Sequence, residues 1–302
     1  MKHQKVKLWL GIGVTTMLSG CQMQEVNGGG GGHDMATHDH AQQHSGGEGG
    51  EGGEGGFNPY SHIAATAGGE GGEGGEGGEG GASVGLSPRT NSAVYYAELG
   101  MMRGHLRSGR DIYEAGAPAM AAPHMAHPLV EHYPDLKLAL RARGVTGMED
   151  ALENLAKVAG TGASWDEIAP AYQDAQQVIT EAQQKVQLNL QSLPQFVSDV
   201  TLALAKQAVH EYEEALDGER FALIDEYQDG RGFMLVAQDL VREIQPHLAS
   251  RGDEAYRSVM AALDELMVAW PSALPPEKPP VTMSELYASL SKLDLALSGY
   301  RR

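Results

Sequence analysis

A long glycine-rich stretch limits which parts of this chain can fold. Residues 27–81 contain an unbroken glycine run at 28–32 and two tracts of Gly-Gly-Glu repeats at 46–56 and 68–81. Glycine loses much backbone entropy on ordering, and closely spaced glutamates repel one another. We therefore expect residues 21–91 to form a disordered, extended tether, and any hydrophobic core to lie after it.

The segment before the tether has the pattern of an export signal. It begins with a basic stretch that holds Lys2, Lys5 and Lys7, and continues in an apolar run over 8–18. That run has the length of a signal peptide and is too short to span a membrane as a mature helix. We expect residues 1–20 to be a leader that takes no part in the fold.

The end of this leader resembles the lipobox of bacterial lipoproteins. It reads Leu18-Ser19-Gly20-Cys21, with small residues directly before the thiol. The resemblance implies that Cys21 receives a diacylglycerol, with palmitate as a typical acyl group, and anchors the chain to a membrane. Gln22 follows where an Asp would favour retention, so the resemblance implies the outer membrane, facing the periplasm or the cell surface. The alternative is a free thiol in an ordinary signal sequence.

Cysteine usage and charge exclude several classes of function. Cys21 is the only cysteine, so the rest of the chain has no disulfide, zinc knuckle, iron–sulfur site or cysteine nucleophile. The formal net charge of −18 argues against nucleic acid as a partner, because phosphates require a basic face. An acidic chain of this kind is soluble and attracts cations.

From Ser92 onward, apolar residues recur at helical spacing and alternating strand patterns are absent. We expect an all-α domain over 92–302, a helical bundle of about seven or eight helices. The expected helices cover 92–115, 128–143, 148–159, 165–190, 194–216, 219–250, 254–270 and 284–297. Gly230, Gly232 and Pro246 are weak points inside the sixth of these.

The tether holds the densest histidine cluster in the chain. Imidazole together with carboxylate is a normal ligand set for zinc, copper or nickel. The candidate tether ligands are His33, His38, His40 and His44. The alternative is a solvated linker with incidental histidines. A short island at 57–63 interrupts the glycine-rich sequence and could dock on the domain or on a partner.

In the domain, the first helix carries a histidine between two glycines. Gly104 and Gly109 each cost about 1 kcal/mol against Ala in a helix interior, which indicates close approach of another helix or a ligand. His105 lies on the same face as Glu98 and could ligate a metal with it. The alternative is a histidine at the core edge, bonded to a neighbouring carboxylate.

The segment 123–133 is the best candidate for a site. His124 and His127 are close enough in sequence to share an ion, and Glu131 lies one turn inside the helix that Pro128 is expected to start. His132 belongs to the same segment. The alternative is that the prolines shape a turn and the histidines bond to backbone groups there.

Two acidic side chains complete the predicted metal site. Glu226 and Asp229 share one face of a long helix flanked by apolar residues. Buried acids need partners, so we expect either a bound cation or an ion pair with Arg231 or Arg103. A further pair, His210 and Glu214, is one helical turn apart and reads as a solvated face.

The Arg103-Gly104-His105 segment, in an exported helical protein with scattered His and Glu, distantly resembles the imelysin-like family. That family consists of helical bundles associated with iron uptake and carries a Gly-x-His-x-x-Glu motif. Here Gly104 directly precedes His105, and Ser108 stands where the family has Glu. The resemblance implies a helical, iron-related protein and carries no peptidase activity to this chain.

Two functions follow from these patterns. In the first, the chain is an envelope lipoprotein that binds a transition metal, with iron, copper and zinc all open. In the second, it is a structural lipoprotein that meets another envelope protein through a helical face. We expect no enzymatic activity, since no catalytic motif is present. The first reading requires the domain's His and acidic side chains to converge in space, whereas the second predicts an apolar surface patch.

Overall fold

The structure, a computed structural model, describes residues 5–6, 57–63, 86–249 and 252–301. Cys21 and the tether histidines lie outside these residues, as does most of the predicted leader. The described helices are α1 (Ser92–Glu114), α2 (Pro118–His127), α3 (Tyr133–Ala142), α4 (Met148–Ala159), α5 (Trp165–Gln183), α6 (Leu193–Glu214), α7 (Ile224–Glu243), α8 (Gln245–Ala249), α9 (Asp253–Met267) and α10 (Met283–Ser298), and a π-helical turn, η1, spans Pro128–His132. The prediction of an all-α bundle is confirmed.

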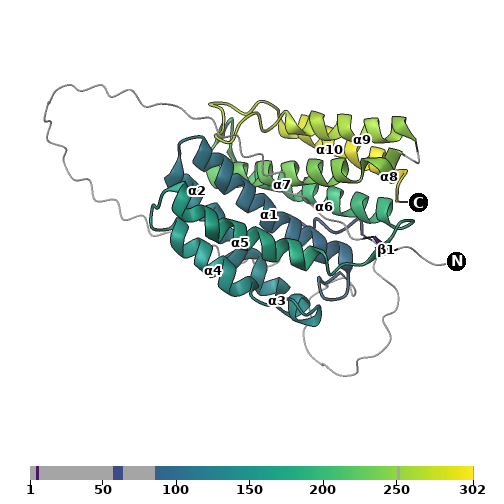
Figure 1. Cartoon of the computed structure of the whole chain (residues 1–302). Helices are drawn as coiled ribbons and strands as arrows, with labels where there is room; N and C mark the ends of the chain where they lie inside the picture. The colour runs from purple at the N-terminus through teal and green to yellow at the C-terminus, as the bar shows by residue number, and fades with distance from the viewer. Residues whose placement is uncertain (1–4, 7–56, 64–85, 250–251, 302) are drawn as a thin grey trace, which may run out of the picture. The chain divides into compact units, whose positions relative to one another are not determined.

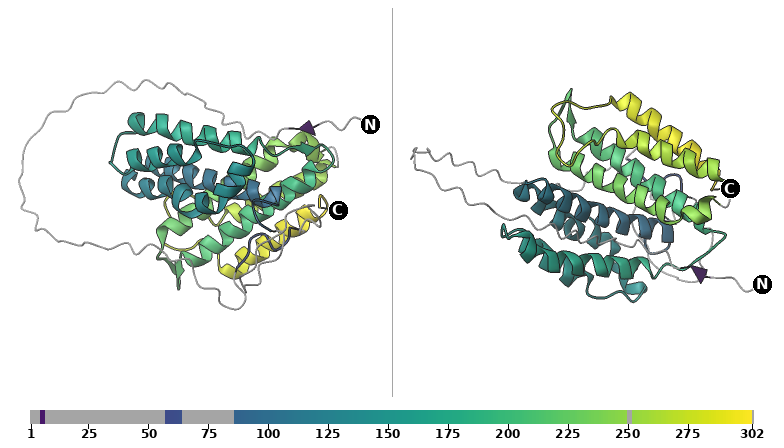
Figure 2. Two further views of the ribbon diagram at one scale, coloured as in Figure 1. Left: turned by 90° about the horizontal axis from the view of Figure 1, so that it is seen from below. Right: turned by 45° about the horizontal axis from the view of Figure 1, so that its top comes forward.

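The helices form two halves that meet along α1 (Figure 1). Helices α4 and α5 pack as a hairpin on one side of α1. On the other side lie the hairpins α6–α7 and α9–α10, which Figure 2 shows in green and yellow beyond α1. Helix α7 contacts α1 and α6 together, so it joins the two halves. None of the helices among the described residues is long and apolar enough to cross a membrane.

Glycines allow α1 and α7 to approach each other closely. A Cβ atom on Gly232 would lie 2.3 Å from the carbonyl oxygen of Gly104 and 2.4 Å from Oγ of Ser108. A Cβ atom on Gly104 would lie 2.4 Å from the Phe233 ring. Real Cβ atoms do not tolerate such distances, so these positions require glycine. The prediction that Gly104 marks a close helix contact is confirmed.

Gly109 allows a similarly close approach between α1 and α2. A Cβ atom there would lie 3.0 Å from Cγ of Met125 and 3.1 Å from the Ala121 carbonyl oxygen, both on α2. The two glycine contacts therefore hold α2 and α7 against the same stretch of α1. His105 lies between them on that stretch.

The segment before Pro128 is helical, so the expectation that a helix begins at Pro128 was wrong, as was the alternative of a turn shaped by the prolines. Helix α2 runs from Pro118 to His127, with Pro123 inside it. Pro128 lacks the N–H that an α-helix would need at that position. The hydrogen bonds there join residues five apart, as in a π-helix, and the Tyr133 N–H bonds to the Pro128 carbonyl. The chain then continues into α3 without a break.

Two other predicted helices have different bounds in the structure. Helix α5 ends at Gln183, and the chain after it forms a strand, β2 (Leu188–Asn189), that pairs with β1 (Lys5–Val6). The helix expected over 219–250 begins later, because β3 (Leu216–Asp217) and β4 (Arg220–Phe221) form a small hairpin first. Gly218, at φ +65°, lies in the turn of that hairpin. Helix α7 then ends at Glu243, just before Pro246.

The island in the glycine-rich sequence docks on the domain. Ile63 is buried in the core, and the Tyr60 hydroxyl donates to Glu98 of α1. His62 bonds to the carbonyl oxygen of Asp199 on α6 at 2.8 Å. We call residues Asn58–Ile63 the strap, because they bridge α1 and α6.

We predict that Gly232→Ala destabilises the domain by about 1–3 kcal/mol, since the added methyl group must push α1 and α7 apart. The free energy of unfolding in urea measures this change. Gly299→Ala is the matched control, because a Cβ atom at Gly299 meets nothing within 4 Å and should leave stability nearly unchanged. Equal stability of the Gly232→Ala variant and the parent chain would contradict the close contact.

Candidate metal centre

The candidate site lies where the two halves of the domain meet. Helix α1 contributes His105, α2 contributes His124 and His127, and η1 contributes Glu131 and His132. Helix α7 supplies Asp229 from the other half. These side chains form two overlapping groups that could hold a metal ion, and His105 belongs to both.

The first group is organised around the buried carboxylate of Asp229. Its Oδ1 atom lies 2.6 Å from Nδ1 of His105 and 2.7 Å from Nδ1 of His124. Its Oδ2 atom lies 3.0 Å from Nδ1 of His127. The two shortest separations are charge-assisted hydrogen bonds, shorter than the spacing of two ligands around one ion. Asp229 therefore serves first as the common acceptor for three imidazole rings.

Burial and charge set the protonation of this group. Burial alone would raise the pKa of Asp229, but the neighbouring His105 and His124 lower it well below its ordinary value. Burial opposes a charge on His127, yet its bond to Asp229 raises the pKa of that ring to about 9. Burial lowers the pKa of His105 to about 3. At neutral pH and without a bound metal, Asp229 is therefore ionised, His127 is protonated and His105 is neutral.

Gln228 identifies the proton positions on His124. The Gln228 amide nitrogen donates to the Ala273 carbonyl at 3.3 Å, which leaves its Oε1 atom to accept from Nε2 of His124 at 2.8 Å. Nδ1 of His124 faces the Asp229 carboxylate, so both ring nitrogens must donate. This agrees with the pKa of His124, which Asp229 and Gln228 raise against the effect of burial.

The second group gathers around the other nitrogen of His105. Nε2 of His105 lies 2.9 Å from Nε2 of His132 and 3.3 Å from Oε2 of Glu131. Two ligands bound to one transition metal at about 2.1 Å are separated by about 3.0–3.4 Å. The separation of 3.3 Å lies within this range and that of 2.9 Å lies just below it, so both are close to the edges of a metal coordination sphere. The Glu131 side chain is 46% exposed, so the group opens to solvent.

Hydrogen bonds leave lone pairs facing one another in this second group. His105 donates its Nδ1 proton to Asp229, and His132 donates its Nδ1 proton to Oε2 of Glu98 at 2.8 Å. If both rings are neutral, both Nε2 atoms carry lone pairs across the 2.9 Å gap. The contact therefore requires either a proton on Nε2 of one ring or a metal cation. Burial raises the pKa of Glu131 above its ordinary value.

Each of these two rings has the partner that metal-binding histidines usually have. A ligating histidine donates its other N–H to a carboxylate, which fixes the ring and raises its basicity. Asp229 does this for His105, and Glu98 does it for His132. The other oxygen of Glu98 accepts from the Tyr60 hydroxyl at 2.5 Å. The His105, His132 and Glu131 group is thus a ligand set with its supporting shell in place.

Most of the predicted site residues come together. His105, His124, His127, Glu131 and Asp229 all belong to the two groups. Glu226 does not, because it lies in a carboxylate cluster with Glu211 and Glu214. Burial and the adjacent Glu226 carboxyl raise the pKa of Glu211 well above its ordinary value.

The expected arginine partners of the buried acids are engaged elsewhere. Arg231 pairs with Asp111 at 2.6 Å, and Arg103 donates to Thr180 and Gln183. Histidines, not arginines, compensate the charge of Asp229. His210 and Glu214 approach within 3.4 Å, as their helical spacing predicts.

His132 is the one side chain of the ligand set that the sequence analysis did not choose. It lies five residues after His127, a spacing that puts two side chains on different faces of an α-helix. The π-helical turn changes this register, because its hydrogen bonds join residues five apart. Pro128 inside a histidine-rich segment is the only sequence signal of that change.

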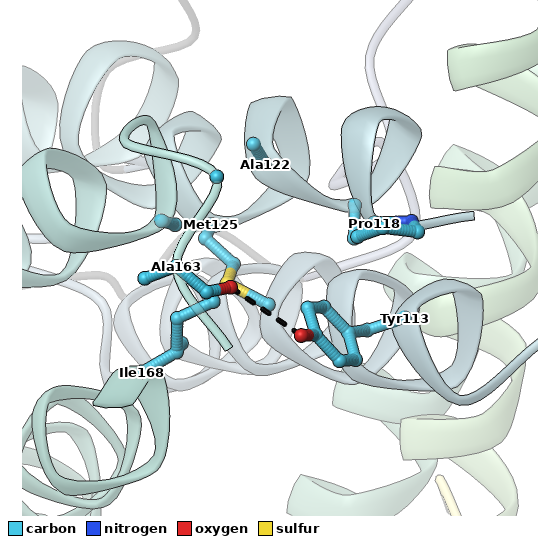
Figure 3. A pocket seen from close by; sticks show the side chains of 9 residues that line it. Tyr113, Pro118, Ala122, Met125, Ala163 and Ile168 are labelled. Atoms are coloured by element: carbon cyan, nitrogen blue, oxygen red, sulfur yellow. Dashed lines mark hydrogen bonds between the residues drawn. The ribbon is translucent and has the colours of Figure 1, made fainter. Parts of the chain in front are cut away.

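A small hollow elsewhere in the domain lacks such chemistry. It lies between α1, α2, α4 and α5 and is partly open to solvent (Figure 3). Tyr113 donates to the carbonyl oxygen of Ala163 across it, and Met125, Ile168 and alanines line the rest. Its lining holds no histidine or carboxylate.

One comparison with known proteins finds a relative. Residues 187–299 match a family described as an iron permease-associated 4-helix bundle domain. No curated protein and no solved structure matches the chain. The matched residues cover α6 to α10, and of the two histidine groups they supply only Asp229. The remaining side chains of the centre come from α1, α2 and η1, outside the match.

We predict that Asp229→Asn lowers the pKa of His127 from about 9 toward 6.5 in the metal-free chain, because the acceptor loses its charge. A histidine whose folded pKa is raised contributes stability that is present below pH 6.5 and is lost as the pH rises toward 9. Histidine NMR titration measures the pKa, and urea unfolding from pH 6 to 9 measures the slope. Asp239→Asn, on the surface of α7, is the control. An unchanged slope in the Asp229→Asn variant would exclude Asp229 as the source.

Proposed function

We propose that this chain is an envelope lipoprotein whose helical domain binds a transition metal ion, with iron as its cargo. One observation carries the proposal. Nε2 of His105, Nε2 of His132 and a Glu131 oxygen lie within 4.8 Å of one another, and carboxylates hold both rings from behind. Such an arrangement is stable around a cation.

The composition of the ligand set supports iron or zinc over softer metals. Two histidines and one carboxylate are the donors of non-haem ferrous sites and also of several zinc sites. No sulfur ligand is available in the described residues of this group, which disfavours Cu(I). The family match favours iron, since the family that covers 187–299 is named for its association with an iron permease.

The position of the centre fits an ion that enters and leaves. His105 and Asp229 are buried, whereas Glu131 is half exposed at the outer edge of the group. The carboxylate cluster of Glu211, Glu214 and Glu226 lies close enough to raise the pKa of Glu131 through Glu226. This negative charge attracts cations toward the centre.

The proposed location of the protein rests on its N-terminal sequence. A lipid on Cys21 and a glycine-rich tether would hold the domain at a membrane surface, with the outer membrane as the favoured one. The tether histidines His33, His38, His40 and His44 would add weak cation capture near the domain. A helical face that meets another envelope protein is compatible with this function, since an iron carrier must deliver its ion.

We predict that the purified chain binds one ferrous ion and that His105→Ala or His132→Ala weakens binding by more than about 100-fold, because each removes a ligand rather than a supporting group. Anaerobic competition against a chelator measures the dissociation constant, and elemental analysis measures the stoichiometry. His247→Ala, on α8, is the matched control and should bind as the parent chain does. No binding of iron, copper or zinc by the parent chain would reject the proposal.

We predict a smaller effect for Glu98→Gln. The amide keeps the shape of Glu98 but loses the charge that holds the His132 ring, so the affinity for Fe²⁺ should fall by about 10- to 100-fold. The same competition experiment measures the change. Glu149→Gln, whose carboxylate pairs with Lys137 on the surface, controls for loss of a charge. An unchanged affinity in Glu98→Gln would exclude Glu98 as a supporting residue of the centre.

A further inference from the structure

The strap, Asn58–Ile63, is anchored on two helices of the domain. Ile63 is buried in the core, and its N–H bonds to the Tyr60 carbonyl at 2.8 Å. Lys206 of α6 donates to Oγ of Ser61 at 3.1 Å and approaches Nδ1 of His62 at 3.3 Å. These contacts hold the strap independently of the metal centre.

Tyr60 extends from the strap to the support of the centre. Its hydroxyl donates to Oε1 of Glu98 at 2.5 Å and lies 3.9 Å from the sulfur of Met101. Burial and the Glu98 charge raise the pKa of Tyr60 well above its ordinary value, so the phenol keeps its proton and remains a donor. The strap thus contributes one hydrogen bond to the metal centre's supporting shell.

The hydrogen bonds form a continuous series from the strap to the ligand set. Tyr60 donates to one oxygen of Glu98, His132 donates to the other, and Nε2 of His132 lies 2.9 Å from Nε2 of His105. Glu98 is largely buried, so its charge depends on these donors. Without the Tyr60 hydroxyl, the carboxylate would lose one of its two side-chain donors and its fixed orientation toward His132.

We infer that Tyr60 is a positioning residue for the metal centre, and that docking of the strap and binding of the ion reinforce each other. This inference rests on the proposed function. An ion bound to Nε2 of His132 strengthens donation from Nδ1 to Glu98, which holds the carboxylate in place for Tyr60. Coupling between two binding events is reciprocal, so the docked strap raises the affinity for the ion by the same factor. The strap lies within the predicted tether over 21–91, so ion loading would be communicated to the segment that leads to the anchor.

The experiment compares Tyr60→Phe with Ser61→Ala in the full chain. The first removes only the hydroxyl that reaches Glu98, and the second removes only a strap contact to Lys206. Tyr60→Phe should weaken Fe²⁺ binding by about 3- to 10-fold, less than a direct supporting residue does, and Ser61→Ala should leave it unchanged. Hydrogen exchange at the Ile63 N–H should slow on addition of Fe²⁺ in the parent chain and in Ser61→Ala, but not in Tyr60→Phe.

A double-mutant cycle tests the route through Glu98. If Tyr60 acts through Glu98, the Tyr60→Phe/Glu98→Gln variant should bind Fe²⁺ as Glu98→Gln does alone. Additive losses of affinity would overturn the route, and equal affinity of Tyr60→Phe and the parent chain would overturn the positioning role. Both outcomes leave metal binding intact. Absence of Fe²⁺ binding by the parent chain would instead reject the proposed function, and the inference with it.

Discussion

The contact between Gly104 and Gly232 determines how close the two halves of the domain can come. The carbonyl oxygen of Gly104 lies where any side chain on Gly232 would have to be. This approach sets Asp229, three residues before Gly232, against His105, the residue after Gly104, at 2.6 Å. A larger residue at either glycine would separate a carboxylate from the ring that compensates its charge. The close packing of α1 against α7 is therefore required for the pairing of Asp229 with His105.

Asp229 shows how a buried charge can organise a site. A carboxylate removed from water requires several donors, and three imidazole rings from α1 and α2 supply them. Because each ring turns one nitrogen toward Asp229, its other nitrogen faces elsewhere. For His105 that second nitrogen faces His132 and Glu131, which creates the candidate ligand set. The electrostatic cost of one buried acid is thus offset by the same bonds that orient a metal ligand.

The residues that match the family and the residues that form the candidate metal centre lie mostly in different parts of the chain. The match covers α6 to α10, whereas the histidines and Glu131 lie on α1, α2 and η1. The matched bundle contributes the acidic side of the centre through Asp229, with Glu211 and Glu226 nearby. A protein with only α6 to α10 would keep these acids and lack every histidine of the two groups. The N-terminal half is therefore what makes a mixed imidazole and carboxylate site.

The sequence by itself determined the helical class and five of the side chains that meet at the centre. These follow from local properties, namely apolar periodicity and the donor chemistry of His, Asp and Glu. Only the tertiary structure decided which donors face each other. It replaced arginine by histidine as the partner of Asp229, moved Glu226 into a separate cluster, and brought in His132 and Tyr60. Helical spacing defines a face, but the packing of helices at glycine contacts and the π-helical turn after Pro128 decide which faces meet.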